Sequence, residues 1–352
     1  MDTVTIDVVS QKAKVSKTTV SRYLNGKYEH MSQKTKLRIK AVIEELDYRP
    51  NLLAQTLKSK KTGLIGIIVS DITNPVTLHM IKGVIDYCSG EGYQVVTASC
   101  DEMLDKEQEY IRSMVDRQVD GLIVNIVDYN EYGLLNSLKE QGVNIVLADR
   151  TINKPLFDTV TTDNYDMTKH AVKTLYSMGY EVVALFSSYL LKSNVRLDRY
   201  NAFLYQSTEF IPDSTNPESL VYIDTKDLDD SYKSSLKDFM SKNAGKKLAV
   251  FASTPMALMN LLNAAYELNI RIPDDLGVCG YDNLNWTRLI SGGITVIEQP
   301  FYEVGTESAK ILIQRIRGEM EGAPKYVELK SKLILRNSTS TLPSKQQPHP
   351  LH

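Results

Sequence analysis

Beyond residue 62 the chain alternates between short apolar runs and amphipathic stretches. The run GLIGIIVS at residues 63–70 is typical of a strand buried on both faces, and the stretch from Val76 to Gly90 is typical of a helix packed on a sheet. The cycle repeats in two similar sets, the second of which starts near residue 165. Further strands are expected at YQVVTAS, GLIVNIV, NIVLAD, EVVALFS, SLVYID, KLAVFAS and LGVCGYD. Connections of this length imply right-handed crossovers, so the pattern predicts an α/β fold with two doubly wound halves of parallel sheet.

The first fifty residues follow a helical period instead. Ser16 is suited to cap a helix, and Val20 and Leu24 form an i, i+4 apolar stripe behind it. Helices are also expected at residues 6–12, capped by Thr5, and at residues 33–47, capped by Ser32. The inward positions of these two helices are expected to be Ile6, Val9, Ala13, Leu37, Ala41, Ile43 and Leu46. The pattern predicts a three-helix bundle whose first two helices form a helix-turn-helix.

The outer face of residues 15–26 is polar and basic, as in a helix that enters the major groove of DNA. Lys17 and Thr18, at its start, are expected to discriminate bases, and Arg22 to contact the duplex. The full set of candidate DNA contacts in this region is Thr5, Ser16, Lys17, Thr18, Thr19, Ser21, Arg22 and Asn25. A surface helical hairpin without a ligand is the alternative.

Charge favours the DNA interpretation. Residues 1–60 carry 12 Lys and Arg against 6 Asp and Glu, whereas the rest carries 29 against 37. A basic segment on an acidic body indicates a polyanionic partner for one end of the chain, although a charged run can also be a solvated face.

Composition excludes several classes of protein. The 352 residues are 42% hydrophobic and 24% charged, and no stretch reaches the roughly 18 consecutive apolar residues of a membrane span. Residues 1–30 hold no apolar signal-peptide core, so a cytoplasmic protein without a membrane partner is expected. Cys88, Cys100 and Cys279 have no metal-ligand spacing and are predicted to be buried. Nucleotide-binding, nucleophile-elbow and zinc motifs are missing, so neither an enzyme nor a cofactor or metal is expected.

The order of motifs resembles the lactose-repressor (LacI/GalR) family of transcriptional regulators. The resemblance begins with TIDVVSQKAKVSKTTVSRYLNG and YRPNLLAQTLKSKKTGLIGIIVSDITNP, and continues through VDGLIV, DR at 149–150, DN at 163–164, IPDDLGVCGYDN and TVIEQP to near residue 338. Lys14 stands where the family turn usually has glycine, and we expect lysine to be accommodated if that turn stays right-handed. The resemblance implies a dimer that binds a palindromic DNA operator under the control of a small-molecule effector.

The resemblance also implies the organisation of the domains. These are a headpiece at residues 1–49, a hinge helix and linker at 50–61, a periplasmic-binding-protein-like body of two lobes, and a disordered tail at 339–352. The first lobe would comprise residues 62–161 and 292–321, and the second residues 162–291 and 322–338, with later crossings near 290–294 and 318–324. In the hinge helix, Asn51, Ala54 and Leu57 match positions that pair in the minor groove, with Leu57 as the wedge. A flexible tether is the alternative.

Polar residues follow the predicted strands, where ligands of such sheets bind. They are Asp71, Asn74, Asn125, Asp149, Arg150 and Asp282. Each could instead be a turn or cap residue. The resemblance implies that Asn125, Asp149, Arg196 and Asp282 line the effector pocket, with Arg196 as the ligand clamp. The usual glycine three places later is Arg199, and Ser253-Thr254 replaces an Asn-Asp pair.

Fewer acceptors and additional arginines favour an anionic effector, so a sugar acid or phosphosugar is preferred to a neutral sugar. The sequence therefore predicts a dimeric regulator of a carbohydrate or sugar-acid operon, and we expect it to act as a repressor. A solute-binding protein of a sugar transporter is the alternative, but such a protein should carry an export signal and lack a basic headpiece.

Overall fold

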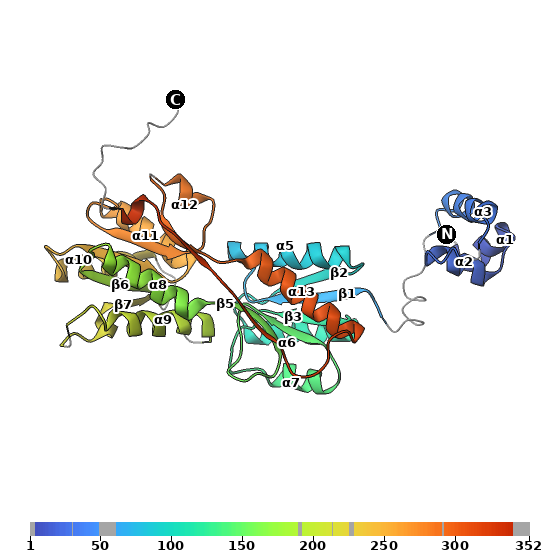
Figure 1. Ribbon diagram of the computed structural model, residues 1–352, viewed down its shortest axis with the longest axis horizontal. Helices are drawn as coiled ribbons and strands as arrows, with labels where there is room; N and C mark the ends of the chain where they lie inside the picture. The colour runs from blue at the N-terminus through green and yellow to red at the C-terminus, as the bar shows by residue number, and fades with distance from the viewer. Residues whose placement is uncertain are drawn as a thin grey trace, which may run out of the picture. The chain divides into compact units, whose positions relative to one another are not determined.

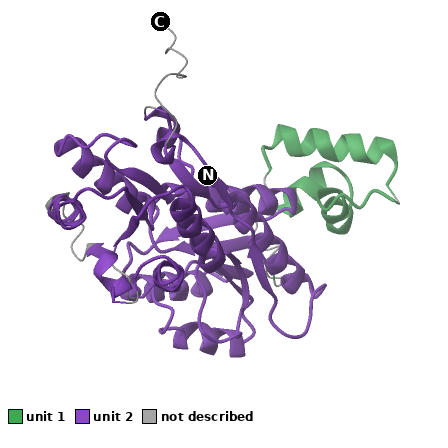
Figure 2. Ribbon diagram, turned by 60° about the vertical axis from the view of Figure 1, so that its left-hand side comes forward, with its two compact units in different colours: residues 1–62 green, residues 63–352 purple. Residues whose placement is uncertain are grey.

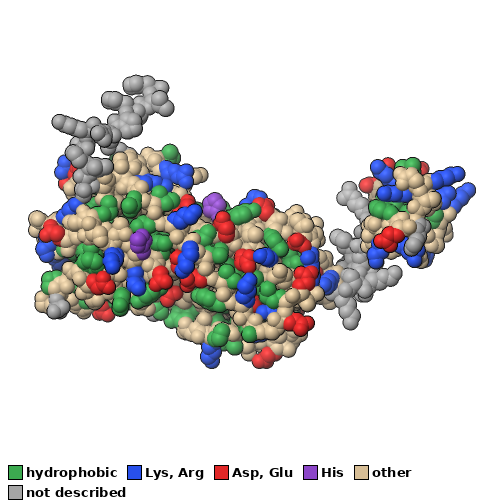
Figure 3. All heavy atoms as spheres, in the orientation of Figure 1, with side chains coloured by type: hydrophobic (Ala, Val, Ile, Leu, Met, Phe, Trp, Pro, Cys, Tyr) green, Lys and Arg blue, Asp and Glu red, His purple; other side chains and the backbone are tan. Residues whose placement is uncertain are grey.

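A computed structural model of the chain describes residues 4–29, 31–48, 61–188, 192–212, 214–224, 229–290 and 292–340 (Figure 1). The chain divides into two compact units, residues 1–62 and 63–352 (Figure 2). In Figure 3, Lys and Arg side chains gather on the headpiece, whereas both signs of charge are interspersed over the body. Among the described residues, every helix is too short or too polar to traverse a bilayer.

The headpiece contains the three predicted helices, α1 (Ile6–Lys12), α2 (Lys17–Leu24) and α3 (Gln33–Glu45). The Oγ of Ser16 accepts a hydrogen bond from Thr19 N at 3.1 Å, and the Oγ of Ser32 accepts one from Thr35 N at 3.2 Å, so both predicted caps are confirmed. Thr5 also occupies the N-cap position of α1, but its side chain makes no capping hydrogen bond.

Two details of the headpiece differ from the sequence pattern. Leu37 is 57% exposed and Ala41 is also exposed, because α3 turns Ile39 and Val42 inward instead. Ile39 and Val42 share one helical face with Ile43 and Leu46, so the last two predicted positions are confirmed and only Leu37 and Ala41 lie off this face. The turn before α2 does not stay right-handed, since Lys14 has a φ of +50°. Its side chain is exposed to solvent, so the left-handed backbone is the main cost.

The first lobe of the body is a six-stranded sheet in the order β11-β5-β4-β3-β1-β2. Its strands are β1 (Leu64–Val69), β2 (Gln94–Ser99), β3 (Gly121–Val124), β4 (Ile145–Ala148), β5 (Asp158–Thr162) and β11 (Tyr326–Leu329). Helices α5 (Pro75–Gly90) and α13 (Phe301–Arg317) pack on one face, and α6 (Leu104–Asp116) and α7 (Gly133–Glu140) on the other. Alternate residues of β1 enter these two cores, which explains its continuously apolar sequence.

The second lobe is a six-stranded sheet in the order β12-β10-β9-β8-β6-β7. Its strands are β6 (Val182–Ser188), β7 (Val221–Asp224), β8 (Leu248–Ala252), β9 (Gly277–Tyr281), β10 (Thr295–Glu298) and β12 (Lys332–Ile334). Its helices are α8 (Asn164–Ser177), α9 (Asn194–Ser207), α10 (Asp229–Lys242), α11 (Pro255–Glu267) and α12 (Trp286–Leu289), with short 3₁₀ turns η1 (Pro217–Leu220) and η2 (Asn337–Thr339). The predicted α/β fold with two lobes of mostly parallel sheet is confirmed.

The later crossings between the lobes differ from those expected. Strand β10 pairs with β9 in the second sheet, so the chain returns to the first lobe after residue 298 and not at 290–294. Strand β11 then pairs with β5 in the first sheet, and β12 with β10 in the second, so the last crossing lies at residues 330–331 and not at 318–324. The first boundary failed because β10 belongs to the second sheet and not to the first, and the second boundary failed because the short strands β11 and β12 carry no strong apolar period.

Helices α5 and α13 approach closely beside the cleft. A Cβ at Gly305 would overlap the carbonyl oxygen of Met80, and one at Gly83 would overlap that of Tyr302. The two glycines therefore let the helix backbones touch. This contact fixes α5, whose first turn forms one wall of the cleft described next.

Candidate functional site

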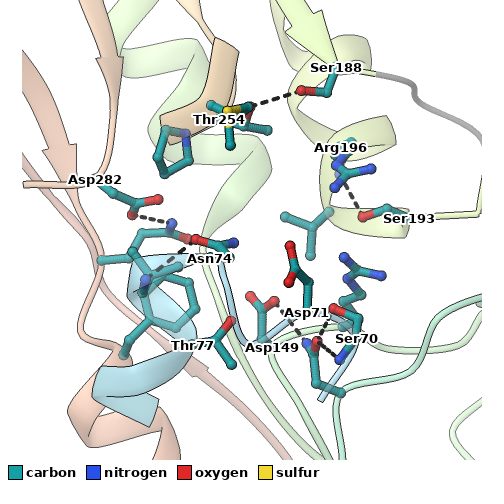
Figure 4. Close-up of a pocket in the computed structure, with 18 of the residues that line it drawn as sticks. Ser70, Asp71, Asn74, Thr77, Asp149, Ser188, Ser193, Arg196, Thr254 and Asp282 are labelled. Atoms are coloured by element: carbon teal, nitrogen blue, oxygen red, sulfur yellow. Dashed lines mark hydrogen bonds between the residues drawn. The ribbon is translucent and has the colours of Figure 1, made fainter. Parts of the chain in front are cut away.

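A cleft of about 500 Å³ lies between the two lobes, at the carboxyl ends of their strands. All seven residues predicted for effector binding line it, namely Asp71, Asn74, Asn125, Asp149, Arg150, Arg196 and Asp282. Glu102, Lys192, Arg199, Thr254, Gln299 and Phe301 also line it and were not proposed. Figure 4 shows Ser70, Asp71 and Asp149 of the first lobe facing Ser193 and Arg196 of the second.

Asp149 presents an unsatisfied acceptor in this cleft. It follows β4 with a φ of +66°, and its Oδ2 accepts a hydrogen bond from Asn125 Nδ2 at 3.1 Å. Its Oδ1 is buried and has no hydrogen-bond partner. Burial raises the pKa of this carboxyl above its ordinary value, against the opposing effect of Arg150. A buried unpaired oxygen is costly, so Asp149 is suited to accept a hydrogen bond from a ligand hydroxyl.

Asn125 supports Asp149. Its amide nitrogen also donates to Ala148 O at 3.0 Å, and its Oδ1 accepts hydrogen bonds from the backbone N and the Oγ of Ser70. The hydrogen-bonding capacity of the amide is therefore filled within the protein. Asn125 ties the ends of β1, β3 and β4 together and holds one oxygen of Asp149.

Asp282 repeats the arrangement in the second lobe. It follows β9 with a φ of +74°, is only 3% exposed, and accepts a hydrogen bond from Gln299 Nε2 at 2.7 Å. Burial raises the pKa of Asp282 to about 6, although Arg199 and Gln299 favour the ionised form. Each lobe thus places one buried carboxyl, in left-handed backbone, directly after a strand.

Asp71 and Asn74 have local roles as well. Asp71 Oδ1 accepts hydrogen bonds from the backbone N of Thr73 at 2.8 Å and from its hydroxyl at 2.7 Å, and Asn74 caps α5. The turn-and-cap alternative is therefore correct for both residues, and both also line the cleft.

Arginines of both lobes meet at one carboxylate. Arg150 of the first lobe is 7% exposed and forms a two-point ion pair with Glu102, in which Nη1 lies 2.9 Å from Oε2 and Nη2 contacts Oε1. Arg196, on α9 of the second lobe, donates from Nη2 to the same Oε1 at 3.3 Å. Burial opposes ionisation of Glu102, but the hydrogen bonds and charges of Arg150 and Arg196 outweigh it and lower its pKa.

Arg199, noted in the sequence only as an additional arginine where glycine is usual, has a structural role beside the cleft. It is 4% exposed, and its guanidinium donates to Asn164 Oδ1 at 2.8 Å, to Ser253 O at 2.6 Å and to Gln299 Oε1 at 3.0 Å. The guanidinium carbon also lies 3.5 Å from the centroid of the Tyr281 ring. Its spacing from Arg196, i and i+3 on one helix, was the available signal. Arg199 joins α8, β8, β9 and the crossing after β10.

Ser253 and Thr254 stand where the family usually has an Asn-Asp pair. Of the two, only Thr254 lines the cleft. Thr254 caps α11 by accepting a hydrogen bond from Ala257 N at 3.1 Å, and its hydroxyl lies 3.2 Å from that of Ser188. Ser253 is fully buried and bonds to Ser187 beneath the surface. Neither carries a charge, so this wall offers hydroxyl groups and no carboxylate.

In the headpiece, the outer face of α2 is exposed at Lys17, Thr18 and Arg22. Lys17 forms an ion pair with Asp7 of α1. Thr19 is engaged with the Ser16 cap, and the Asn25 amide donates to Ser21 O at 2.8 Å, so their side chains serve the helix ends. The predicted hinge residues Asn51, Ala54 and Leu57 lie outside the described residues.

Comparison with known proteins identifies this combination of headpiece and cleft. Residues 5–51 match the sequence profile of bacterial regulatory proteins of the lacI family, and residues 172–339 match that of the periplasmic binding protein-like domain. The HTH-type transcriptional regulator KdgR of Bacillus subtilis (strain 168) is 37% identical over 334 residues, which cover 95% of this chain and 97% of that protein. The chain belongs to the LacI family.

Other relatives agree. The HTH-type transcriptional regulator PtxS of Pseudomonas putida is 31% identical over 96% of both chains. The lac repressor dimer bound to operator and the anti-inducer ONPF has the same fold, with a TM-score of 0.80 at 22% identity over 96% of this chain and 99% of that one. This LacI-family chain is therefore a DNA-binding transcriptional regulator and not an enzyme.

Proposed function

We propose that this regulator is a dimeric repressor whose affinity for a palindromic operator is set by an anionic sugar derivative, a sugar acid or a phosphosugar, bound between its two lobes. The unpaired buried oxygen of Asp149 carries the proposal. It is an acceptor that the protein itself leaves unused, in a cleft at the ends of the strands.

The chemistry of the lining supports a ligand with two different ends. Asp149 and Asp282 offer carboxylate oxygens to hydroxyl groups on one side, and Arg196 offers its guanidinium group to an anion on the other, next to the Glu102–Arg150 ion pair. A polyhydroxy acid carries hydroxyl groups for the carboxylates and an anionic group for the guanidinium. One relative bears a name that fits a carbohydrate ligand, the ribose operon repressor of Halalkalibacterium halodurans, which is 29% identical over 95% of this chain.

Exposed apolar side chains on both lobes support a dimer. On α5, Leu78 is 53% exposed and Ile85 is 41% exposed, and on α11, Met259 is 36% and Tyr266 is 85% exposed. Repeated large apolar residues on one helix indicate a surface that is covered in the working molecule. Two copies joined through such surfaces would present two headpieces to the two halves of a palindrome.

Helix α2 supplies the side chains that we propose to contact DNA. Thr18 and Arg22 are exposed on its outer face, one helical turn apart, while Val20 anchors the opposite face in the core. We expect Arg22 to carry specific contacts, with Lys17 contributing charge after release from Asp7. The candidate hinge residues would then add minor-groove contacts.

A thermal-shift comparison tests the effector. Gluconate or gluconate 6-phosphate should raise the melting temperature of the full chain, because a ligand selective for the folded state stabilises it by mass action, whereas glucose should have a weaker effect. Asp149→Asn should abolish the shift. Asp166→Asn, which removes an exposed carboxylate on α8, is the matched control and should preserve it. Equal shifts in both variants would contradict the assignment of Asp149.

A further inference from the structure

One acidic side chain in the cleft is placed unlike the others. Glu102 follows β2 in a turn where it and Asp101 have φ values of +55° and +51°, and its backbone N donates to Ser70 O at 2.7 Å. This anchored left-handed turn positions the carboxylate between Arg150 and Arg196, which belong to different lobes. Left-handed backbone at two successive non-glycine residues is costly, so the turn is maintained by its surroundings.

The two ion pairs of Glu102 differ in strength. Arg150 holds both carboxylate oxygens, and its Nη1 also donates to Ile126 O at 3.1 Å, so this guanidinium is fixed within the first lobe. Arg196 contacts one oxygen of Glu102 at 3.3 Å and retains 23% of its side-chain exposure. A second anion at the cleft would therefore compete for Arg196 and not for Arg150.

We propose that Glu102 occupies an anion subsite of the cleft as a substitute for the effector's own anionic group. When a carboxylate or phosphate enters, it takes Arg196, and Glu102 stays on Arg150. The contact between the lobes then passes from Glu102–Arg196 to ligand–Arg196, so binding exchanges one salt bridge for another. This inference rests on the proposed function, since it concerns the same cleft.

Glu102 thereby determines which anions are accepted. A small anion must displace Glu102 from Arg196 and sit beside a negative carboxylate, with no further contact to compensate. A sugar acid has hydroxyl groups that also bind Asp149, and these contacts offset the repulsion from the Glu102 carboxylate. Glu102 would thus reject abundant inorganic anions while permitting the polyhydroxy acid.

The test compares Glu102→Gln with Asp101→Asn by isothermal titration of the full chain. Glutamine keeps the size and one acceptor oxygen but removes the charge that opposes the ligand. Asp101 is the neighbouring residue, pairs with Lys106 at 2.7 Å and lies outside the cleft lining, so its variant makes the same change of charge without touching the subsite. Gluconate should bind Glu102→Gln about tenfold more tightly than wild type, and glucose with unchanged affinity. Asp101→Asn should match wild type.

Inorganic phosphate separates this inference from the proposed function. It should bind Glu102→Gln measurably but not wild type or Asp101→Asn, and the gain should vanish in the double variant Glu102→Gln/Arg196→Gln. If no sugar acid binds any variant while phosphate still binds Glu102→Gln, the proposed effector class fails and the subsite stands. If Glu102→Gln binds gluconate and phosphate no better than wild type, Glu102 merely positions the arginines and the inference is overturned. Circular dichroism at matched temperatures verifies that each variant is folded.

Discussion

Replacing Asp282 by Asn should make this regulator more stable at neutral pH. The pKa of Asp282 is raised from 3.8 to about 6 because the side chain is buried. Above pH 6 the folded protein therefore holds a carboxylate that is more easily ionised in the unfolded chain. Asparagine removes that charge and can keep the hydrogen bond from Gln299 Nε2, which is 2.7 Å long.

The size of the effect follows from linkage. A shift of about two units corresponds to about 3 kcal/mol of unfolding free energy at pH 7.5, and to about half of that at pH 5. For a raised pKa, the wild type loses stability as the pH rises from about 4 to 6, and regains it as the pH falls. The advantage of Asp282→Asn should therefore grow with pH through that window and disappear below about pH 4.

Urea unfolding followed by tryptophan fluorescence measures this difference. Trp286 is the single tryptophan of the chain and lies on α12, directly after the loop that carries Asp282. Asp275→Asn is the control and should lower the free energy of unfolding at pH 7.5. Hydrogen bonds from Arg271 lower the pKa of Asp275, so its carboxylate stabilises the folded protein. If Asp282→Asn is equally or less stable than wild type at pH 7.5, burial does not destabilise this carboxylate and the reasoning is refuted. If Asp282→Asn is more stable and gluconate no longer raises its melting temperature, Asp282 binds the ligand and lowers the stability of the folded protein.

Three further outcomes are expected. Arg22→Ala should abolish specific operator protection in footprinting while gluconate still shifts the melting temperature, and an unchanged footprint would exclude α2 as the reading helix. Gly305→Ala should lower the unfolding free energy by roughly 2 kcal/mol or more in urea titrations, because its methyl group meets the Met80 carbonyl, whereas Gly133→Ala has open space and should be neutral. Leu78→Asp should convert the dimer to monomer in sedimentation velocity, and a variant that still sediments as a dimer would place the interface elsewhere.

Most elements of the body could be predicted because a strand buried on both faces must be continuously apolar, as β1 and β8 are. The prediction missed β5, β11 and β12. β5 reads DTVTT and is buried throughout, yet its three threonines resemble the composition of a loop. Their hydroxyls donate to Phe157 O, Asp149 O and Gln299 Oε1, and most of these partners are distant in the chain. β11 and β12 are half exposed, and their partners come from distant parts of the chain, so no local period marks them.

The site could be predicted as far as strand ends define it. Asp149 and Asp282 follow apolar strands, so their position at the cleft was deducible. Glu102, Gln299 and the structural role of Arg199 were not found, because they depend on contacts with residues 35 to 137 positions away in the chain. The sequence located the acceptors of the cleft together with Arg150 and Arg196, but not Glu102, which joins these two arginines across the lobes.

We propose that an anionic sugar derivative in the cleft controls the binding of this regulator to DNA. The most direct measurement is a fluorescence anisotropy titration of an operator duplex, selected by the protein from promoter fragments, with and without a panel of sugar acids and their phosphates. We expect at least one of them to shift the operator dissociation constant of the wild type by about tenfold, the scale of allosteric coupling, and Asp149→Asn to remove the shift. An identical shift in Asp149→Asn, or none with any anionic sugar, would contradict this proposal.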